Sequence, residues 1–236
     1  NNPASEIYVN FKENKAKEVG LYFERHNLDE NASQDELLKL IDSLNQNRKI
    51  HGMIVQLPLP AGINSSYVLN AIPRGKDVDV LGERALGAFY NNRNPILPPA
   101  AATVKTILEK ISLDLEEMKV GVVGLGKLVG KPVGLWLIGK CKELHLLGKD
   151  SDLKILKTCE IVISGVGKAG IIKPGMLKEG AGVIDFGYYY FPDGEVSGDF
   201  SAEDTEKLSF YTPTPGGTGP ILVAELFRNF YTLANI

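Results

Sequence analysis

Apolar residues recur along this chain in two different spacings, and their order predicts a fold of alternating helices and strands. Helical spacing occurs in the stretch 33–47, where Ser33 and Glu36 form the S-x-x-E pattern of a helix N-terminus. Further helices are expected at 65–72, 100–111 and 219–234. Strand-like or extended runs are found at 20–25, 52–60, 76–81, 119–123, 143–147, 159–167 and 181–187. This alternation favours an α/β fold over classes in which helices and strands are segregated.

Two local signals refine this order of elements. The segment 188–199 predicts a β-hairpin around Asp193 and Gly194. The segment 91–99 is rich in proline and asparagine and marks a domain boundary, and the helix expected at 100–111 would connect the two domains.

Composition narrows the class of protein without identifying it. The 236 residues are enough for two α/β layers, and a hydrophobic content of 44% with 23% charged residues is ordinary for a globular protein. The net charge of −3 arises from interleaved charges, which argues against a nucleic-acid partner or an acidic membrane surface. No apolar run reaches the roughly 18 residues that span a bilayer.

Cysteine and histidine usage argues against a metal site. Cys141 and Cys159 do not form a C-x-x-C pair, and the three histidines are scattered along the sequence. We therefore expect no bound metal, and two reduced cysteines in a cytoplasmic protein.

A glycine-rich turn is the first candidate for chemistry. Gly124, Gly126 and Gly130 lie between a predicted strand and a predicted helix, with one residue more than G-x-G-x-x-G. Such a turn lets the backbone approach a pyrophosphate at a helix N-terminus, although a tight turn also uses glycine for steric reasons alone. The next strand is followed by Lys149 and Asp150, so a 2′-phosphate and a ribose hydroxyl are both possible partners.

A second candidate is the pair Tyr8 and Lys12, four residues apart. In a helix, both side chains would lie on one face. Taken alone, the pair is either an exposed surface pair or an acid–base site with a perturbed pKa.

Several longer strings resemble the methylenetetrahydrofolate dehydrogenase/methenyltetrahydrofolate cyclohydrolase family of one-carbon metabolism. They run from end to end in the family's order, and VQLPLP and TPTPGGTGP are far more specific than a glycine motif. The strings are NPASEIYVNFKENKAKEVG, GMIVQLPLP, KDVDVLG, VVGLGKLVGKP, GAGVIDFGYYY, VSGDF and TPTPGGTGP.

The resemblance implies an N-terminal αβα folate-binding domain, a C-terminal Rossmann-type NAD(P)-binding domain and a folate cleft between them. The expected domains are 1–97, completed by the C-terminal helix 218–236, and 98–217. The implied activities are oxidation of 5,10-methylenetetrahydrofolate with NADP, NAD not being excluded, and hydrolysis of the methenyl product to 10-formyltetrahydrofolate. Homodimers are common in the family, and we expect one here.

The resemblance also assigns roles to individual residues. Lys12 is the implied proton-transfer residue, Tyr8 packs on the folate, and Gln56 holds the lysine amine. Asp79 would accept hydrogen bonds from the pterin, and Pro215, Gly216 and Gly217 would border the cleft. The implied cofactor-binding residues are Gly124, Leu125, Gly126, Val129, Gly130, Lys149, Gly165 and Gly167.

Each of these residues also has a structural explanation. Lys12 alone is most often a surface lysine and Asp79 a turn residue or helix cap, whereas Gln56 in an apolar run already suggests a polar task. The proline-glycine string at 212–220 could serve only to begin the C-terminal helix, because Pro220 suits a first turn.

The chain departs from the family pattern at several positions. Pro98–Ala101 reads PPAA where the family has a P-C-T-P-type string, and Val80 and Leu222 replace a glycine and a threonine. Gly126 replaces a common serine, and Leu125 stands where some members have an arginine for the 2′-phosphate. These departures leave open a monofunctional, NAD-preferring dehydrogenase and a non-catalytic folate- or nucleotide-binding homologue. Since family members have a helix and a strand before the NPAS string, we also expect such a segment before Asn1 in the native polypeptide.

Overall fold

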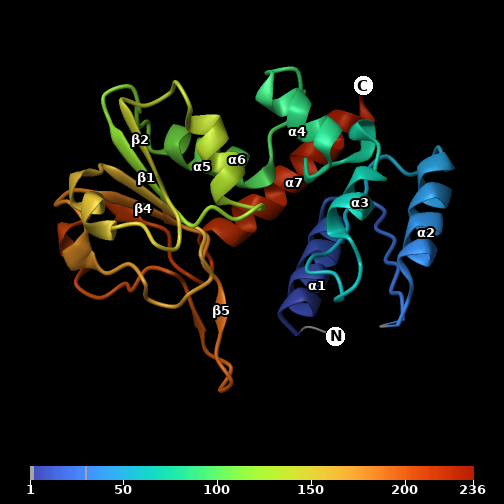
Figure 1. Ribbon diagram of the computed structural model, residues 1–236, viewed down its shortest axis with the longest axis horizontal. Helices are drawn as coiled ribbons and strands as arrows, with labels where there is room; N and C mark the ends of the chain where they lie inside the picture. The colour runs from blue at the N-terminus through green and yellow to red at the C-terminus, as the bar shows by residue number, and fades with distance from the viewer. Residues whose placement is uncertain (1–2, 30) are drawn as a thin grey trace. The chain divides into compact units, whose positions relative to one another are not determined.

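The computed structural model describes residues 3–29 and 31–236, with side chains described from Glu6 onward, and it divides into two compact units (Figure 1). Unit 1 comprises residues 1–99 and 223–236, and unit 2 comprises residues 100–222. Asn2, which opens the NPAS string, lies outside the described residues. Within the described part of the chain, no helix is long and apolar enough to cross a membrane.

Unit 1 is built from helices around a small apolar core. They are α1 (Pro3–Glu18), α2 (Gln34–Gln46), α3 (Ser65–Asn70), the 3-10 helix η1 (Arg74–Lys76), α4 (Glu83–Tyr90) and most of α7 (Thr218–Ala234). The core contains Leu37, Ile41, Met53, Val68 and Ile72, which are contributed by α2, α3 and the loops beside them.

Helix α2 has both ends fixed by side chains. At its start, Ser33 Oγ accepts a hydrogen bond from the Glu36 amide at 3.2 Å, and the Glu36 carboxylate accepts one from the Ser33 amide at 2.7 Å. The predicted capping box is therefore confirmed. At its end, Lys76 Nζ donates to the carbonyls of Asn45 and Asn47, at 2.7 and 3.1 Å, where a cation also complements the helix dipole.

Two predicted strand-like runs in unit 1 are wrong, and the segment 76–81, predicted as extended, contains a turn. The segments 20–25 and 52–60 form no strand, and the only pairing recorded for them among the described residues is a single bridge between Met53 and Asp77. The run 76–81 begins at the last residue of η1, forms that bridge at Asp77 and then turns back on itself. β-propensity marks residues that suit a sheet surface, but a strand also needs a partner with which to form a ladder.

Unit 2 contains a five-stranded parallel sheet with the order β2-β1-β3-β4-β7. Its strands are β1 (Lys119–Val123), β2 (Glu143–Leu147), β3 (Ile161–Ser164), β4 (Gly182–Asp185) and β7 (Phe210–Tyr211). The first four lie within the predicted runs, which are confirmed. β1, β3 and β4 are short and almost entirely buried, as expected for central strands of a sheet covered on both faces, whereas the edge strand β2 is buried only at Leu147.

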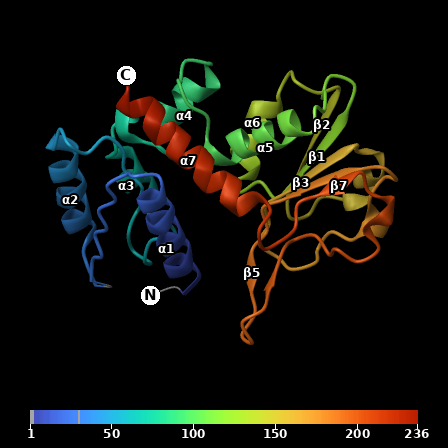
Figure 2. The ribbon, with the colours of Figure 1, turned by 180° about the vertical axis from the view of Figure 1, so that it is seen from behind.

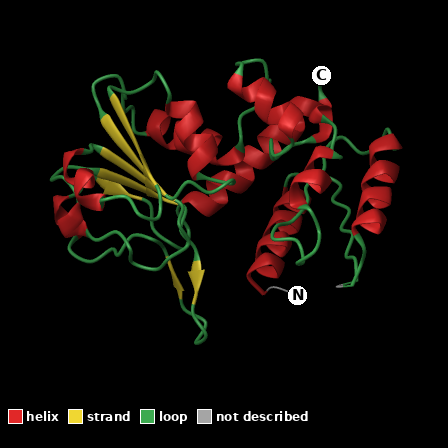
Figure 3. Ribbon diagram, in the orientation of Figure 1, coloured by secondary structure: helices red, strands yellow, loops and turns green. Residues whose placement is uncertain are grey.

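Helices cover the two faces of this sheet (Figure 3). On one face, α5 (Pro99–Lys110) and α6 (Gly130–Leu137) pack against the strands through a cluster that includes Val104, Leu108, Val133 and Leu137. On the other face lie the 3-10 helices η2 (Leu153–Thr158) and η3 (Pro174–Met176), with Leu156 fully buried. The sheet is therefore doubly wound, with its topological switch between β1 and β3.

A two-stranded hairpin projects from unit 2, as Figures 1 and 2 show. It pairs β5 (Tyr189–Tyr190) with β6 (Val196–Ser197) in antiparallel register, as predicted around Asp193 and Gly194. The 3-10 helix η4 (Thr205–Lys207) then leads into β7.

Candidate active site

Helix α1 brings Tyr8 and Lys12 together, as their spacing predicts. Lys12 is 6% exposed, and its ammonium nitrogen lies 4.7 Å from the centre of the Tyr8 ring, a cation–π distance. An ordinary surface lysine keeps its charged end in water. The burial of Lys12 therefore excludes the simple surface pair that the sequence left open.

Gln56 reaches Lys12 from the segment that follows Met53. Its Oε1 accepts a hydrogen bond from Lys12 Nζ at 3.1 Å, and its Nε2 donates to the Leu57 carbonyl at 2.9 Å. The second bond fixes the amide so that its oxygen faces the lysine. The bond between Leu57 and Pro58, immediately after it, is cis.

Asp79 lies in a turn that begins at Asp77. The Asp77 carboxylate, 2% exposed, accepts hydrogen bonds from the amides of Leu81 and Gly82, at 3.0 and 2.8 Å. Asp77 therefore closes the turn, while Asp79 stays close enough to Lys12 and Tyr8 to change the pKa of both. Val80, the departure from glycine, nevertheless has φ 55°, in the left-handed region that glycine favours.

Burial and neighbouring charges shift the pKa values of Tyr8, Lys12 and Asp79 from their ordinary values. Burial lowers the pKa of Lys12, and the nearby Asp79 carboxylate partly offsets that fall. Burial, offset by Lys12 and reinforced by Asp77, raises the pKa of Asp79 from 3.8 to about 6. Burial and the Asp79 charge raise the pKa of Tyr8, so its phenol stays protonated at neutral pH. The cluster thus combines a lysine of lowered pKa, a phenol donor and a carboxylate.

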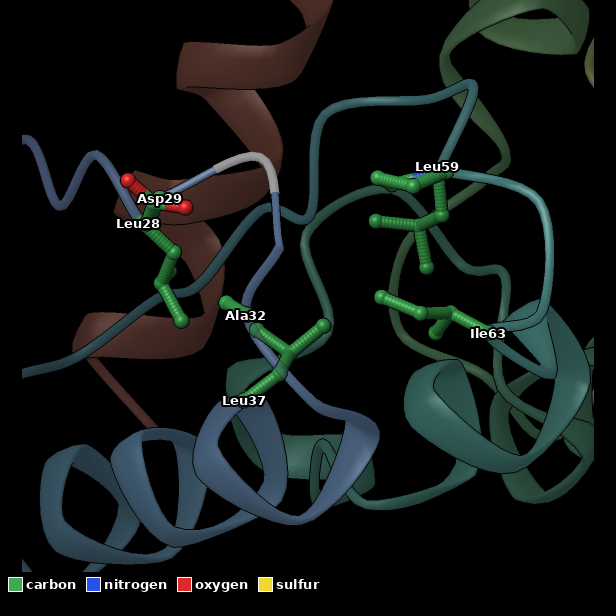
Figure 4. Close-up of a pocket in the computed structure, with 7 residues that line it drawn as sticks. Leu28, Asp29, Ala32, Leu37, Leu59 and Ile63 are labelled. Carbon is green, nitrogen blue, oxygen red and sulfur yellow. The ribbon is translucent and has the colours of Figure 1, made fainter.

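Two cavities adjoin these elements within unit 1. One, of about 970 Å³, is bordered by Lys12 and Gln56 and otherwise largely by apolar side chains such as Met53, Leu226 and Phe230. The other, of about 530 Å³, is lined by Leu28, Asp29, Ala32, Leu37, Leu59, Pro60 and Ile63. Figure 4 shows Leu37, Leu59 and Ile63 pointing toward a common space. The second cavity lacks a cluster of polar side chains, so it is not a candidate for catalysis.

In unit 2, the predicted glycine turn lies at the carboxyl ends of β1 and β3, at the switch point of the sheet. Gly124 has φ 85°, and a Cβ there would lie 2.9 Å from the Gly165 carbonyl oxygen. A Cβ on Gly130 would overlap the Gly124 carbonyl, and one on Gly165 would lie 2.6 Å from Val129 Cγ1. These contacts require glycine at three positions and bring four of the predicted cofactor residues together.

The remaining predicted cofactor residues lie around this turn. Gly126 and Gly167 face open space, because a Cβ at either would meet no atom within 4 Å. Leu125 is half-buried and packs against the core of unit 2, whereas Lys149 is exposed just after β2. Of these four residues, only Lys149 offers a positive charge for a 2′-phosphate.

Two buried carboxylates that the sequence did not single out hold the loops beside this turn. Asp199 is fully buried and accepts hydrogen bonds from Ser164 Oγ at 2.6 Å, the Val166 amide at 2.6 Å and the Lys168 amide at 2.8 Å. Asp185 accepts from the amides of Gly187 and Phe200. The strings VIDFG and SGDF contain them, but nothing in their spacing indicates these contacts.

The proline-glycine string forms a tight loop in unit 2 before α7. The bond between Thr214 and Pro215 is cis, Gly216 has φ 96°, and the Gly217 amide donates to the Pro213 carbonyl at 2.9 Å. Thr218 Oγ1 donates to the Asp185 carbonyl at 2.8 Å, which ties the start of α7 to the end of β4. The structural role predicted for this loop is therefore present, and a role in substrate binding stays a prediction.

These features are typical of an α/β enzyme with a nucleotide-binding fold in one unit and a polar site in the other. A doubly wound parallel sheet carries a glycine-lined turn at its switch point, which is where nucleotides bind in such folds. A second unit holds a buried lysine among a phenol, an amide and a carboxylate. Within residues 3–29 and 31–236, no three His, Cys, Asp or Glu side chains are grouped to hold a metal ion.

The chain belongs to the tetrahydrofolate dehydrogenase/cyclohydrolase family. Residues 1–79 match the family's catalytic domain, and residues 98–236 match its NAD(P)-binding domain. The family resemblance and the α/β fold class predicted from sequence are thus confirmed.

Individual relatives extend over nearly the whole chain. The bifunctional protein FolD of Helicobacter hepaticus is 37% identical over 238 residues, covering 99% of this chain and 83% of the relative. Among solved structures, the bifunctional FolD methylenetetrahydrofolate dehydrogenase/cyclohydrolase of Campylobacter jejuni has a TM-score of 0.95 and 32% identity, covering 99% of this chain and 84% of that one. The Trypanosoma brucei FolD, complexed with NADP and an inhibitor, has a TM-score of 0.93 and 29% identity, covering 99% and 83%.

Proposed function

We propose that this protein oxidises 5,10-methylenetetrahydrofolate with NAD(P)+ and hydrolyses the resulting methenyl cation to 10-formyltetrahydrofolate. One observation carries the proposal: a buried Lys12, hydrogen-bonded to Gln56, stacked near Tyr8 and coupled to Asp79. Family membership supports both activities, and the geometry supplies a means for the second.

Hydrolysis needs a base close to an electrophilic carbon. Water adds to the methenyl carbon and loses one proton. The hydroxyl then gives up its second proton and becomes the formyl C=O as the bond from that carbon to N5 breaks and N5 takes up a proton, so one proton is released overall. Because burial lowers its pKa, Lys12 has a larger neutral fraction than a surface lysine, and a neutral amine can accept the water's proton. When Nζ donates to Gln56 Oε1, its lone pair is left free for that proton.

Tyr8 and Asp79 are assigned to substrate binding. The Tyr8 phenol stays protonated and can donate a hydrogen bond, while its ring offers a face for packing. The Asp79 carboxylate, with a pKa of about 6, is mostly ionised at pH 7 and can accept from the pterin's N–H groups. Its charge also limits the fall in the pKa of Lys12, so the two residues set the proton affinity of the site together.

The turn after β1 fits a dinucleotide. The turn before α6 has no side chains at three glycines, Gly124, Gly126 and Gly130. Backbone amides at a helix N-terminus favour a pyrophosphate. We propose that Val129, Gly165 and Gly167 complete this site with Leu125 and Lys149. When bound, NAD(P)+ supplies the acceptor for the hydride that leaves the methylene carbon.

A second candidate function, a dehydrogenase that prefers NAD, is favoured by one observation. Leu125 packs into the core of unit 2, so that position contributes no charge to a 2′-phosphate. Lys149 is the counter-argument, and we propose NADP as the cofactor on that basis. Turnover measured with NAD+ and with NADP+, in wild type and in Lys149→Ala, separates the two candidates.

The proposal is tested by two assays on one preparation. NAD(P)+-dependent oxidation of 5,10-methylenetetrahydrofolate follows the first activity, and decay of the methenyl absorbance without cofactor follows the second. Both activities in wild type support the proposal, and oxidation without hydrolysis supports the monofunctional alternative. Binding of the folate without either turnover would identify a non-catalytic homologue and contradict the proposal.

We further propose a homodimer and a cytoplasmic location. The first rests on the family resemblance, and the second on the two cysteines, which are both free thiols. We also propose that 1–97 with 218–236 binds the folate and that 98–217 binds the cofactor. Light scattering at micromolar concentration tests the dimer, and a mass near the monomer's 25.7 kDa would contradict it.

A further inference from the structure

The turn that carries Asp79 is held from two sides by side chains outside the four proposed site residues. On one side is Asp77, whose buried carboxylate accepts hydrogen bonds from the amides of Leu81 and Gly82. Bonds from amides to an ionised carboxylate are among the stronger ones in a protein. They fix the residues that follow Asp79.

On the other side is Asn229, from α7. Its Nδ2 donates to the Val78 carbonyl at 2.9 Å and to the Leu97 carbonyl at 2.8 Å, and the residue is only 4% exposed. Both hydrogens of one amide are therefore used, and one of them fixes the residue before Asp79. The packing at Gly52, where a Cβ would lie 2.8 Å from both Phe230 and Val78, shows how closely α7 approaches this turn.

The backbone between the contacts of Asp77 and those of Asn229 has an unfavourable conformation. Val80 is fully buried and β-branched, yet its φ is 55°. Such residues persist in the left-handed region only where surrounding contacts hold them there. Asp79 therefore sits on a turn whose shape depends on Asp77 and Asn229.

We propose that Asp77 and Asn229 are positioning residues that hold the Asp79 carboxylate in place to bind the folate. The inference rests on the proposed function, because it takes Asp79 as the residue that meets the pterin. Neither Asp77 nor Asn229 is proposed to touch the substrate, so each acts through the turn.

The test uses Asn229→Ala and Asp77→Asn, each beside a matched control. Asn235→Ala alters an exposed asparagine directly after the same helix, whose Nδ2 donates to the Tyr231 carbonyl one turn before it. Asp42→Asn alters an exposed carboxylate on α2. The measurements are kcat, KM for the folate, KM for NAD(P)+, calorimetric Kd for the folate without cofactor, and Tm.

We expect Asn229→Ala and Asp77→Asn to raise the KM and Kd for the folate at least tenfold. Their KM for NAD(P)+ should stay within twofold of wild type, and both control variants should be unchanged. Unchanged folate KM and Kd with a lowered Tm would overturn the inference, and so would parallel rises in both KM values. If Asn229→Ala precipitates, Asn229→Ser keeps one donor and should give an intermediate folate Kd.

The inference and the proposed function can fail separately. If the wild type is active and both Asn229→Ala and Asp77→Asn bind the folate normally, only the inference is overturned. A wild type that binds the folate without turnover overturns the proposed function, while the Kd values of the variants still decide the inference. A wild type that does not bind the folate overturns both.

Discussion

Replacing Asp79 with asparagine should make the protein more stable at neutral pH, although it removes a residue proposed to bind substrate. In the folded state, the pKa of Asp79 is raised from 3.8 to about 6, chiefly by burial. Between these two values the folded state holds the proton more tightly than the unfolded state. The free energy of unfolding therefore falls as pH rises through this window.

The change in the free energy of unfolding can be calculated from the pKa shift of Asp79. About two pKa units correspond to about 3 kcal/mol, because each unit is about 1.4 kcal/mol. The full penalty is present above about pH 6 and absent below about pH 4. The attraction between Asp79 and Lys12 is already included in the folded-state pKa, so we expect a gain of about 3 kcal/mol at pH 8, or roughly 6–12 °C in Tm.

The assay is denaturation at pH 4 and pH 8, followed by two probes. Circular dichroism follows the helices of both units, whereas the fluorescence of Trp136, the only tryptophan in the sequence, reports on unit 2. Since Asp79 lies in unit 1, the gain should be present in the dichroism signal at pH 8 and vanish at pH 4. Lys12 lowers the pKa of Asp79, so Lys12→Met should move the window to higher pH. A variant no more stable than wild type at pH 8, or equally stabilised at both pH values, would show that the charge of Asp79 does not destabilise the folded state.

Three further substitutions test the cofactor turn and the fold. Gly130→Ala should abolish NAD(P)+ binding by calorimetry, because its Cβ would overlap the Gly124 carbonyl; binding at wild-type affinity would show that the turn is not the cofactor site. Lys149→Ala should raise the KM for NADP+ by up to about fivefold and leave that for NAD+ unchanged, since an exposed charge pair such as one with a 2′-phosphate contributes up to about 1 kcal/mol; equal effects on both would contradict the assignment. Ser33→Ala should lower the free energy of unfolding by about 1 kcal/mol, because it removes the cap that bonds the Glu36 amide. A loss below 0.3 kcal/mol in urea denaturation would contradict that estimate.

The sequence predicted local features well where neighbouring residues decide the structure. The Ser33 capping box, the strand–turn–helix around Gly124 and the hairpin at Asp193 and Gly194 all depend on residues close together in the chain. The sequence also predicts β1, β2, β3 and β4 of unit 2, and each of them has a parallel partner that completes its ladder. The segments 20–25 and 52–60 have similar composition and form no strand, so composition alone could not distinguish them.

The sequence predicts the residues of the site itself, but not the residues that hold them in place. Helical spacing brought Tyr8 and Lys12 to one face, and the family resemblance supplied Gln56 and Asp79 as expectations. Asn229, by contrast, contacts a carbonyl 151 positions earlier in the chain, and no local pattern indicates such a contact. Asp77 was visible in the string KDVDV, but only the structure shows that its carboxylate closes the turn while Asp79 remains coupled to Lys12.

The proposed role of Lys12 in hydrolysis can be tested with a single substitution. Lys12→Met keeps the length and apolar stem of the side chain and removes the amine that bonds Gln56. The hydrolysis rate of methenyltetrahydrofolate should fall by a factor of about 10² to 10⁴, the usual contribution of a positioned base. The protein should stay folded and still bind NAD(P)+, whose proposed site lies in unit 2. Hydrolysis at the wild-type rate in a folded Lys12→Met protein would show that Lys12 is not the base.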